Sequence, residues 1–269
     1  MKRVLVILVT HNGMHWLPRC MESVAGNDVY VVDNDSTDGS ADWIQANYPS
    51  AKLVRSAENL GFTLANNLGF DYAIAKGYDY VYLLNQDAWL DTDTIEKLVA
   101  AAEEHSEYAV LSPMQMTDGF KELDRLFKKD KTPPAAHWLM RVAAVKQVGK
   151  FSEMFPYYGQ DDDWCNRAKY HGWKIGIVPE ARAVHDRAQR KESKERIIDR
   201  NYRVGSLVRL CNINRPLWER FLFVILFTIV KSVKYFSFLP FKHFVSICRQ
   251  LPEVRTARLA ARKEGMGFV

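Results

Sequence analysis

Short apolar runs alternate with helix-like segments along the chain up to residue 115. The apolar runs predict the strands Val4–Thr10, Val29–Asp33, Lys52–Ser56, Tyr80–Asn85 and Ala109–Ser112. The segments between them predict the helices His15–Ala25, Ser40–Tyr48, Thr63–Lys76 and Thr92–His105, the last with Asp91 as its capping residue. Strands and helices that alternate in this way form βαβ units, so we expect an α/β fold with a mostly parallel sheet.

The pattern becomes less regular after this region. Thr117–Pro134 is polar and charged, and it predicts an exposed loop that can fold over a ligand. The following pattern predicts a strand at Ala135–Arg141, a short helix at Val142–Val148, a helix from the acidic run after Gly159 to His171, and a strand at Lys174–Val178.

The C-terminal part has a different character. Arg187–Arg203 is highly charged, and Leu217–Val245 is strongly apolar but interrupted by charged residues and a proline. Its longest uninterrupted stretch, Phe221–Val230, has half of the roughly 20 residues that a membrane-spanning helix needs. We therefore expect a segment that lies in the interface of an anionic membrane leaflet, or alternatively a pair of helices that packs on the rest of the chain or on another subunit. These features divide the chain into a domain of residues 1–186 and a basic, apolar helical extension of residues 187–269.

Composition and charge limit the class of protein. The chain has 269 residues, of which 48% are hydrophobic and 26% charged, and this balance argues against disorder. Residues 187–269 contain 18 Lys and Arg against 6 Asp and Glu, whereas the remainder contains 19 against 26. A basic extension on an acidic body predicts an anionic partner, either a membrane surface or a nucleic acid. The four cysteines have no metal-binding spacing, so we expect reduced, buried thiols in a cytosolic compartment.

Polar residues follow three of the predicted strands. They are His11-Asn12, Asp33-Asn34-Asp35 and Asn85-Gln86-Asp87. Ligands of such sheets bind at the carboxyl ends of the strands, where Asp33 and Asp35 could accept hydrogen bonds from a base or ribose. The alternative for this segment is an ordinary turn, because residues 33–39 are rich in turn formers. Asp87 could bind a divalent ion that bridges two phosphate oxygens.

An acidic run and a histidine add further candidates. The run Asp161-Asp162-Asp163 is typical of a first helical turn, but the aromatic segment 155–159 before it favours a buried approach. An aspartate in that place could act as a general base toward a hydroxyl. A lone histidine such as His185 is more often structural, although imidazole also completes oxygen and nitrogen sites for manganese-like ions.

Six motifs occur in the order of glycosyltransferase family 2, whose members have the GT-A fold. They are Val9-Thr10-His11-Asn12, Val31–Ser40, Asn59-Leu60-Gly61-Phe62 with Asn66-Asn67-Leu68-Gly69, Leu83–Asp87, Gly159–Arg167, and Val178–Ala181 leading to His185. The chain resembles this family over about Val4 to His185. The resemblance implies a Rossmann-like, mostly parallel central sheet flanked by helices, with the C-terminal helical extension added to it.

The resemblance also implies roles for single residues. The nucleotide-sugar would contact Thr10, Asn12, Asp33, Asp35, Asn59, Gly61, Asn66, Asn85 and Gln86. Asp87 and His185 would bind the divalent cation, Mg²⁺ or Mn²⁺. Asp161 would be the catalytic base, with Gln160, Asp162 and Trp164 on the acceptor side.

Two positions depart from the family pattern. Asn85 replaces the first acid of the DXD metal motif, which lowers the negative charge at the metal, and Gln160 replaces the glutamate before the base. Asn at the first DXD position is similar to rhamnosyltransferase-like members, which implies a dTDP-linked sugar.

These observations predict an inverting glycosyltransferase that uses a dTDP-, UDP- or GDP-linked sugar. Its acceptor would be a hydroxyl of a glycan or of a lipid-linked molecule in bacterial-type surface polysaccharide synthesis. We expect a cytoplasmic protein, peripheral on the inner face of the cell membrane. A sugar-phosphate nucleotidylyltransferase would need a Gly-rich loop after Thr10, which is absent, and the basic extension lacks a recognition motif, so no nucleic-acid partner is expected.

Overall fold

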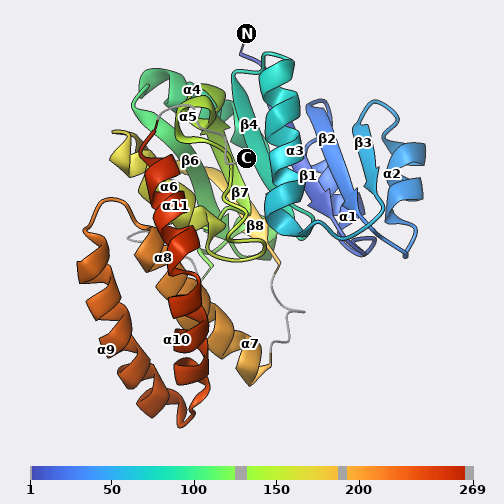
Figure 1. Ribbon diagram of the computed structural model, residues 1–269. Coiled ribbons are helices and arrows are strands. Elements are labelled where there is room, and N and C mark those ends of the chain that lie inside the picture. The colour runs from blue at the N-terminus through green and yellow to red at the C-terminus, as the bar shows by residue number, and fades with distance from the viewer. Residues whose placement is uncertain (1, 125–131, 187–192, 264–269) are drawn as a thin grey trace. The chain divides into compact units, whose positions relative to one another are not determined.

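The computed structural model describes residues 2–124, 132–186 and 193–263. They form two compact units (Figure 1). The first comprises Met1–Lys146 with Trp173–Gln189, and the second comprises Gln147–Gly172 with Arg190–Val269. The segment 147–172, which lies inside the predicted N-terminal domain, thus groups with the C-terminal part of the chain.

The first unit is built on one mixed, mostly parallel sheet. Its strands are β1 (Val4–Thr10), β2 (Asp28–Asn34), β3 (Lys52–Ser56), β4 (Tyr80–Asn85), β5 (Ala88–Leu90), β6 (Tyr108–Met116), β7 (His137–Arg141) and β8 (Lys174–His185). Their spatial order is β3-β2-β1-β4-β7-β6-β8-β5. β7 pairs antiparallel with β4 and β6, β5 pairs antiparallel with β8, and the other pairs are parallel. The α/β fold predicted from the alternating pattern is confirmed.

Helices cover both faces of this sheet (Figure 1). The helices are α1 (Leu17–Glu22), α2 (Ser40–Asn47), α3 (Gly61–Ala75) and α4 (Thr94–Glu104), with a short 3-10 turn, η1 (Asp118–Phe120), and α5 (Val142–Val148). Side chains of α1, α2 and α4 share one apolar core with Val6 and Leu8 of β1. α3 packs on the opposite face, where a Cβ atom at Gly69 would lie 2.6 Å from Ile7 Cγ2. Burial on both faces explains why the central strands are apolar without interruption.

The strand predictions are largely confirmed, with two differences. β5 has no counterpart among the predicted strands, because three residues carry no recognisable period. β8 continues through the expected Pro179-Glu180 turn to His185. The register of β8 against β6 shifts here, since Val178 pairs with Pro113 and Arg182 with Met114, so the residues between Val178 and Arg182 form a bulge.

Three helices begin two residues from their predicted starts: α1, α4, and α3, which begins at Gly61 and not at Thr63. α1 begins at Leu17, just before a proline in its first turn, and not at His15. Asp91 does not cap α4, because Asp93 occupies the position before the helix in a left-handed conformation with φ of 58°. The Asp91 carboxylate accepts the backbone N–H of Thr92 at 2.9 Å instead. Part of the predicted loop Thr117–Pro134, residues 125–131, lies outside the described residues.

The second unit is helical. It contains α6 (Gln160–Tyr170), α7 (Lys194–Ile198), the π-helix η2 (Asp199–Val204), α8 (Gly205–Cys211), α9 (Leu217–Tyr235), α10 (Leu239–Arg249) and α11 (Leu251–Ala261). Phe155, Tyr202, Val224, Ile247 and Val254 belong to one buried core that joins the segment before α6 to α7, η2 and α8–α11. The C-terminal helices therefore form part of a core and are not a separate appendage.

Polar contacts link α6 to the C-terminal helices within this unit. Asn212 Nδ2 donates to Asn166 Oδ1 at 3.1 Å, and an imidazole nitrogen of His171 lies 2.9 Å from the carbonyl oxygen of Ala261. These contacts explain why residues 147–172 group with the chain that follows residue 190. Across the described residues, no helix combines the length and the apolar character that crossing a bilayer requires.

The four cysteines are free thiols, as predicted. Cys20, Cys165 and Cys211 are buried, whereas Cys248 is partly exposed. Burial raises the pKa of each thiol, and at Cys20 the neighbouring Asp87 carboxylate adds to the effect. These thiols are therefore poor nucleophiles.

Candidate functional site

A hydrogen-bond network ties together the carboxyl ends of β1 and β4. Gln86 Oε1 accepts the Thr10 hydroxyl and the His11 backbone N–H, each at 2.8 Å, and Gln86 Nε2 donates to the His11 carbonyl at 3.2 Å. Gly13 is required beside this network, because a Cβ atom there would lie 2.4 Å from Thr10 Oγ1 and 2.5 Å from Gln86 Oε1. The structure thus brings Thr10 and Gln86 together, as the motifs predict.

Asp33 ends β2 at the same edge of the sheet. The side chain is 3% exposed, and its Oδ2 accepts the Ser36 N–H at 3.2 Å. Its Oδ1 is buried and has no hydrogen-bond partner among the described residues. An unsatisfied buried carboxylate oxygen is costly to the fold, so its presence at a strand end indicates a site for a hydrogen-bond donor from a ligand.

The loops beside Asp33 are held in unusual conformations. Asn12 and Asp35 adopt left-handed backbone angles, with φ of 49° and 65°. Asn12 Oδ1 accepts the Thr37 N–H at 2.8 Å, and the Asn12 N–H donates to Ser36 Oγ at 3.0 Å. Left-handed non-glycine residues that are fixed by their neighbours are typical of functional sites.

A turn that contains Asp38 and Ser40 holds these loops in place. Asp38 accepts hydrogen bonds from the Met14 N–H at 2.9 Å and from the Ser40 N–H and hydroxyl at 3.0 and 2.5 Å. Partial burial works against ionisation of Asp38, but these hydrogen bonds outweigh it and hold its pKa below the ordinary value. Asp38 and Ser40 were outside the predicted site, although the Ser-Thr-Asp-Gly-Ser sequence carried a turn signal.

Three predicted nucleotide-sugar residues have structural partners. Asn59 Oδ1 accepts from Asn34 Nδ2 and from the Gly61 N–H, both at 2.9 Å. Asn66 is 2% exposed and donates to the Phe62 carbonyl one helical turn earlier, at 2.8 Å. Asn34, whose Oδ1 accepts the Leu60 N–H at 2.8 Å, links β2 to the start of α3 and was outside the predicted site. These contacts position the N-terminus of α3, and direct nucleotide binding by Asn59, Gly61 and Asn66 remains a prediction.

Asp87 and His185 form a buried pair. Each is 6% exposed, and His185 Nε2 lies 3.3 Å from Asp87 Oδ1. The pairing of β5 with β8 brings them together, because Ala88 lies opposite His185 and the Asp186 N–H donates to the Asp87 carbonyl at 2.8 Å. Asn85 lies at the end of β4, two residues before Asp87.

This pair fits a divalent cation. Among the residues that the structure describes, no group of three or more His, Cys, Asp and Glu side chains is arranged to hold a metal. Mg²⁺ and related ions are nevertheless commonly held by one or two protein ligands, with phosphate and water oxygens completing the shell. A carboxylate oxygen and an imidazole nitrogen 3.3 Å apart are donors of the kind that Mn²⁺ accepts.

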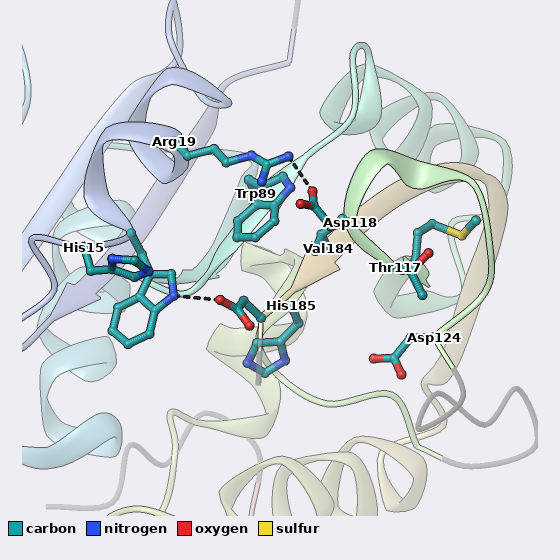
Figure 2. Close-up of a pocket in the computed structure, with 11 residues that line it drawn as sticks. His15, Arg19, Trp89, Thr117, Asp118, Asp124, Val184 and His185 are labelled. Atoms are coloured by element: carbon teal, nitrogen blue, oxygen red, sulfur yellow. Dashed lines mark hydrogen bonds and ion pairs between the residues drawn. The ribbon is translucent and has the colours of Figure 1, made fainter. Parts of the chain in front are cut away.

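A pocket of about 580 Å³ opens beside His185 (Figure 2). Its wall includes Trp16, Arg19, Trp89 and Asp118, and Arg19 lies over the Trp89 ring at 3.9 Å while it donates to Asp118 at 2.6 Å. Trp16 Nε1 donates to Asp186 Oδ2 at 3.0 Å. The pocket combines indole faces with carboxylates, which suits a sugar ring and its hydroxyls. No sequence motif indicated these residues, because the pairing of β5 with β8 brings them together.

The acidic run lies in the second unit. Gly159, with φ of 89°, precedes α6, and Asp161 and Asp162 occupy the first turn of that helix. Asp161 is half-buried, Asp162 is exposed, and Asp161 Oδ1 accepts the Asp162 N–H at 2.9 Å. Gln160 is 6% exposed, and its buried Oε1 has no partner in the described part of the chain. The positive end of the helix favours an ionised carboxylate here, as a general base requires.

Two neighbours of Asp161 have structural roles instead. Asp163 forms a buried ion pair with Arg167, with Oδ2 at 2.8 Å from Nε. Trp164 is fully buried, and its Nε1 donates to the Gly149 carbonyl at 2.8 Å. A side chain without exposed surface cannot contact an acceptor, so the prediction of Trp164 as an acceptor-side residue is not supported. The expected buried approach through residues 155–159 also differs, since Tyr157 and Tyr158 are exposed.

Comparisons with known proteins place these features in a family. The family model of glycosyl transferase family 2 matches residues 5–149. N-acetylglucosaminyl-diphospho-decaprenol L-rhamnosyltransferase of Mycobacterium tuberculosis is 24% identical over 232 residues, which cover 68% of this chain and 76% of that protein. The nucleotidylyltransferase alternative receives no support from these matches.

Solved structures show the same fold. The mannosyltransferase PcManGT from Pyrobaculum calidifontis, in complex with GDP-Man and Mn²⁺, gives a TM-score of 0.63 at 15% identity and covers 96% of this chain and 84% of its own. S. aureus TarS 1-349 gives a TM-score of 0.61 at 16% identity and covers 81% and 68%. The predicted GT-A fold is thereby confirmed. Since the family model matches more than half of its residues, the chain belongs to glycosyltransferase family 2.

Proposed function

We propose that this glycosyltransferase moves a sugar from a nucleotide-diphosphate donor to a hydroxyl group, with inversion at the anomeric carbon. The observation that carries the proposal is the buried Oδ1 of Asp33, which has no hydrogen-bond partner among the described residues and lies at the sheet edge where β4 leads into Asp87. Asp33 would accept a hydrogen bond from the nucleoside, and Thr10, Asn12, Asp35 and Gln86 would shape the pocket around it.

Complexes of structurally similar proteins support a nucleotide-sugar donor. PcManGT was solved with GDP-Man, and TarS was solved with UDP and with UDP-GlcNAc. The mycobacterial relative is named as an L-rhamnosyltransferase, and this name together with Asn85 favours a dTDP-linked deoxysugar among the dTDP-, UDP- and GDP-linked donors.

Asp87 and His185 would hold the divalent cation. When bound, Mg²⁺ or Mn²⁺ supplies positive charge that stabilises the departing diphosphate. PcManGT was solved with Mn²⁺. Asn85 contributes an amide where the family motif has a carboxylate, so the pair Asp87 and His185 would provide the protein ligands.

Asp161 would remove the proton of the acceptor hydroxyl as it attacks the anomeric carbon. The hydroxyl oxygen forms the new glycosidic bond, the bond from the anomeric carbon to the diphosphate breaks, and the diphosphate leaves with its electron pair. Attack from the face opposite the leaving group inverts the anomeric configuration and needs no covalent nucleophile. Gln160 and Asp162 remain the acceptor-side candidates.

The acceptor would be a glycan or a lipid-linked molecule in surface polysaccharide synthesis. The mycobacterial relative is named for an N-acetylglucosaminyl-diphospho-decaprenol, and this name supports an acceptor that is attached to a lipid carrier. A protein acting on such an acceptor would be cytoplasmic and peripheral on the inner face of the membrane. Exposed apolar side chains on α9 and α10 support this location.

Thermal stabilisation tests the donor and metal sites. UDP, dTDP and GDP, each with and without Mn²⁺, should raise the melting temperature, because a ligand that binds the native state stabilises it. The Asp87→Asn variant should lose the increment that depends on Mn²⁺, whereas Asp42→Asn, at an exposed carboxylate of α2, should keep it. A full metal-dependent increment in Asp87→Asn would remove Asp87 from the metal site.

A second variant tests the base. Asp161→Asn should lower transfer by about 10² to 10⁴-fold while nucleotide stabilisation stays unchanged, because the substitution removes only the proton acceptor. Asp42→Asn, at an exposed carboxylate of α2 outside the predicted site, serves as the control and should retain most of the activity. Turnover of Asp161→Asn at the wild-type rate would contradict the assignment.

A further inference from the structure

Helix α9 is apolar on both of its faces. On its inner face, Val224 is fully buried and Thr228 is 2% exposed, and the Thr228 hydroxyl lies 2.6 Å from the Tyr202 hydroxyl. On its outer face, Trp218, Leu222, Leu226, Ile229 and Val233 follow one another at steps of three or four residues. These five residues, here called the outer stripe, are 50% to 68% exposed. A helix that is apolar on both faces normally has both faces covered, but the outer stripe is exposed among the residues that the structure describes.

The turn between α9 and α10 extends this apolar surface. Phe236 has a left-handed backbone with φ of 47° and is 94% exposed, and Phe238 is 81% exposed. Figure 1 shows α9 and α10 joined by this turn at one end of the second unit. Phe241 and Val245 continue the exposed apolar positions along α10. Aromatic side chains thus lie at both ends of the outer stripe, with Trp218 at one end.

The charged residues on either side of the α9–α10 turn are basic. Residues 220–252 contain no Asp or Glu, while Lys234 and Lys242 are exposed beside the turn. Lys231 lies over the rings of Phe227 and Tyr235, at 4.9 and 5.4 Å. A second copy of the chain docked through the α9–α10 turn would bring these lysines together, because the acid of α9, Glu219, lies at the opposite end of that helix. A nucleic acid would pair with the lysines but would leave the outer stripe in water.

An anionic lipid surface can bind both the exposed apolar side chains and the lysines beside them. Apolar side chains gain free energy when they enter the boundary between headgroups and acyl chains, and lysines next to them reach anionic headgroups with their flexible stems. Aromatic residues favour the same interfacial depth. We propose that the outer stripe and the α9–α10 turn insert into the interface of an anionic phospholipid bilayer. This inference rests on the peripheral attachment in the proposed function and specifies the surface and the lipid class.

Vesicle flotation of the full chain tests the proposal. The protein should float with vesicles of phosphatidylcholine and phosphatidylglycerol and only weakly with phosphatidylcholine alone. Combining Leu222→Ser, Leu226→Ser and Val233→Ser should reduce binding by about tenfold or more, because apolar surface no longer leaves water. The matched control is Leu259→Ser on α11, which is 62% exposed but lies outside the outer stripe.

Charge variants provide an independent arm that does not disturb packing. Combining Lys234→Gln and Lys242→Gln should reduce binding to anionic vesicles by about tenfold and leave binding to neutral vesicles unchanged, while Arg255→Gln on α11 should have little effect. Nucleotide-dependent thermal stabilisation of every variant is measured in parallel. It separates a failure of donor binding from a failure of lipid binding, and limited proteolysis of each variant reports whether the helices of the second unit stay folded.

Several results would overturn the proposal. The first is that the wild-type chain does not float with anionic vesicles. The second is that the serine variant floats as the wild type does. The third is that the serine variant changes the oligomeric mass in sedimentation without changing flotation, which would assign the surface to a second copy. The fourth is that an oligonucleotide competes with vesicles for the wild-type chain while the serine variant floats normally.

Discussion

Polar residues at the strand ends adopt conformations that cost folding free energy. Asp33 buries a carboxylate oxygen that has no partner in the part of the chain that the structure describes, and Asn12 and Asp35 have left-handed backbones. Each feature has an energetic cost in the isolated chain. Their concentration at one edge of the sheet is most simply explained by a ligand that binds there.

Replacement of Asp33 separates function from stability. Asp33→Asn removes the buried negative charge but keeps an oxygen able to accept the Ser36 N–H, so we expect no loss of melting temperature. Nucleotide affinity should fall by about tenfold or more, since a hydrogen bond to a charged group contributes about 1.5 to 3 kcal/mol. Isothermal titration with the nucleotide that stabilises the wild type measures the change. Unaltered affinity would show that Asp33 does not contact the nucleotide.

At the scale of elements, the predictable parts are those with a local signal. β1, β2 and β4 were predictable because apolar runs buried on both faces have a clear pattern, and Asp87 because it follows such a run. β5 has only three residues, and the continuation of β8 past Pro179 depends on a bulge. The pocket beside His185 depends on the pairing of these two strands, which is long-range and leaves no trace in the sequence near Trp16 or Trp89.

The buried ion pair of α6 gives a prediction at this scale. Arg167 also donates to the carbonyls of Val148 and Lys150, both at 2.9 Å, and so fixes α6 to the preceding loop. Arg167→Met should destabilise the protein by about 3 to 5 kcal/mol in urea unfolding, because it leaves Asp163 buried and unpaired. Combining it with Asp163→Leu should recover much of this loss. Arg55→Met, at the exposed pair with Asp42, should cost less than about 1 kcal/mol.

The unfolding free energy of the Arg167→Met variant should have a distinctive pH dependence. Burial raises the pKa of Asp163, and Arg167 offsets part of that rise. Without Arg167, the pKa of Asp163 in the folded state lies further above its pKa in the unfolded chain. The stability of the variant therefore approaches that of the wild type at a pH below the unfolded-state pKa. It falls as the pH rises through the folded-state pKa. A deficit in unfolding free energy that does not shrink at acidic pH would contradict this account.

At the scale of the whole molecule, the two units have separate cores. Core residues of the first unit come from Val6 to Ala183, whereas the core of the second joins Phe155 to helices as late as Val254. Arg258 of α11 donates to the carbonyls of Leu210, Asn212 and Arg215 at 2.8, 2.5 and 2.6 Å. The basic composition of the C-terminal part predicted an anionic partner, but composition cannot show that the same helices complete a core with Phe155, which lies before α6 in the chain.

Truncation after Asn214 should therefore affect more than a membrane surface. The shortened chain loses Val224, Ile247, Val254 and Arg258, so the part that carries Asp161 loses much of its apolar core and the donor to the Leu210 carbonyl. The first unit keeps every residue of its own core, and we expect nucleotide-dependent stabilisation to persist. Limited proteolysis with mass spectrometry should show new cleavage within residues 147–172, and transfer to a water-soluble acceptor should fall at least about 100-fold, by the loss of a positioned base. The full-length serine variant of the outer stripe should keep that transfer. If the truncated chain transfers sugar as fast as this variant, the C-terminal helices act only in attachment and do not support the catalytic aspartate.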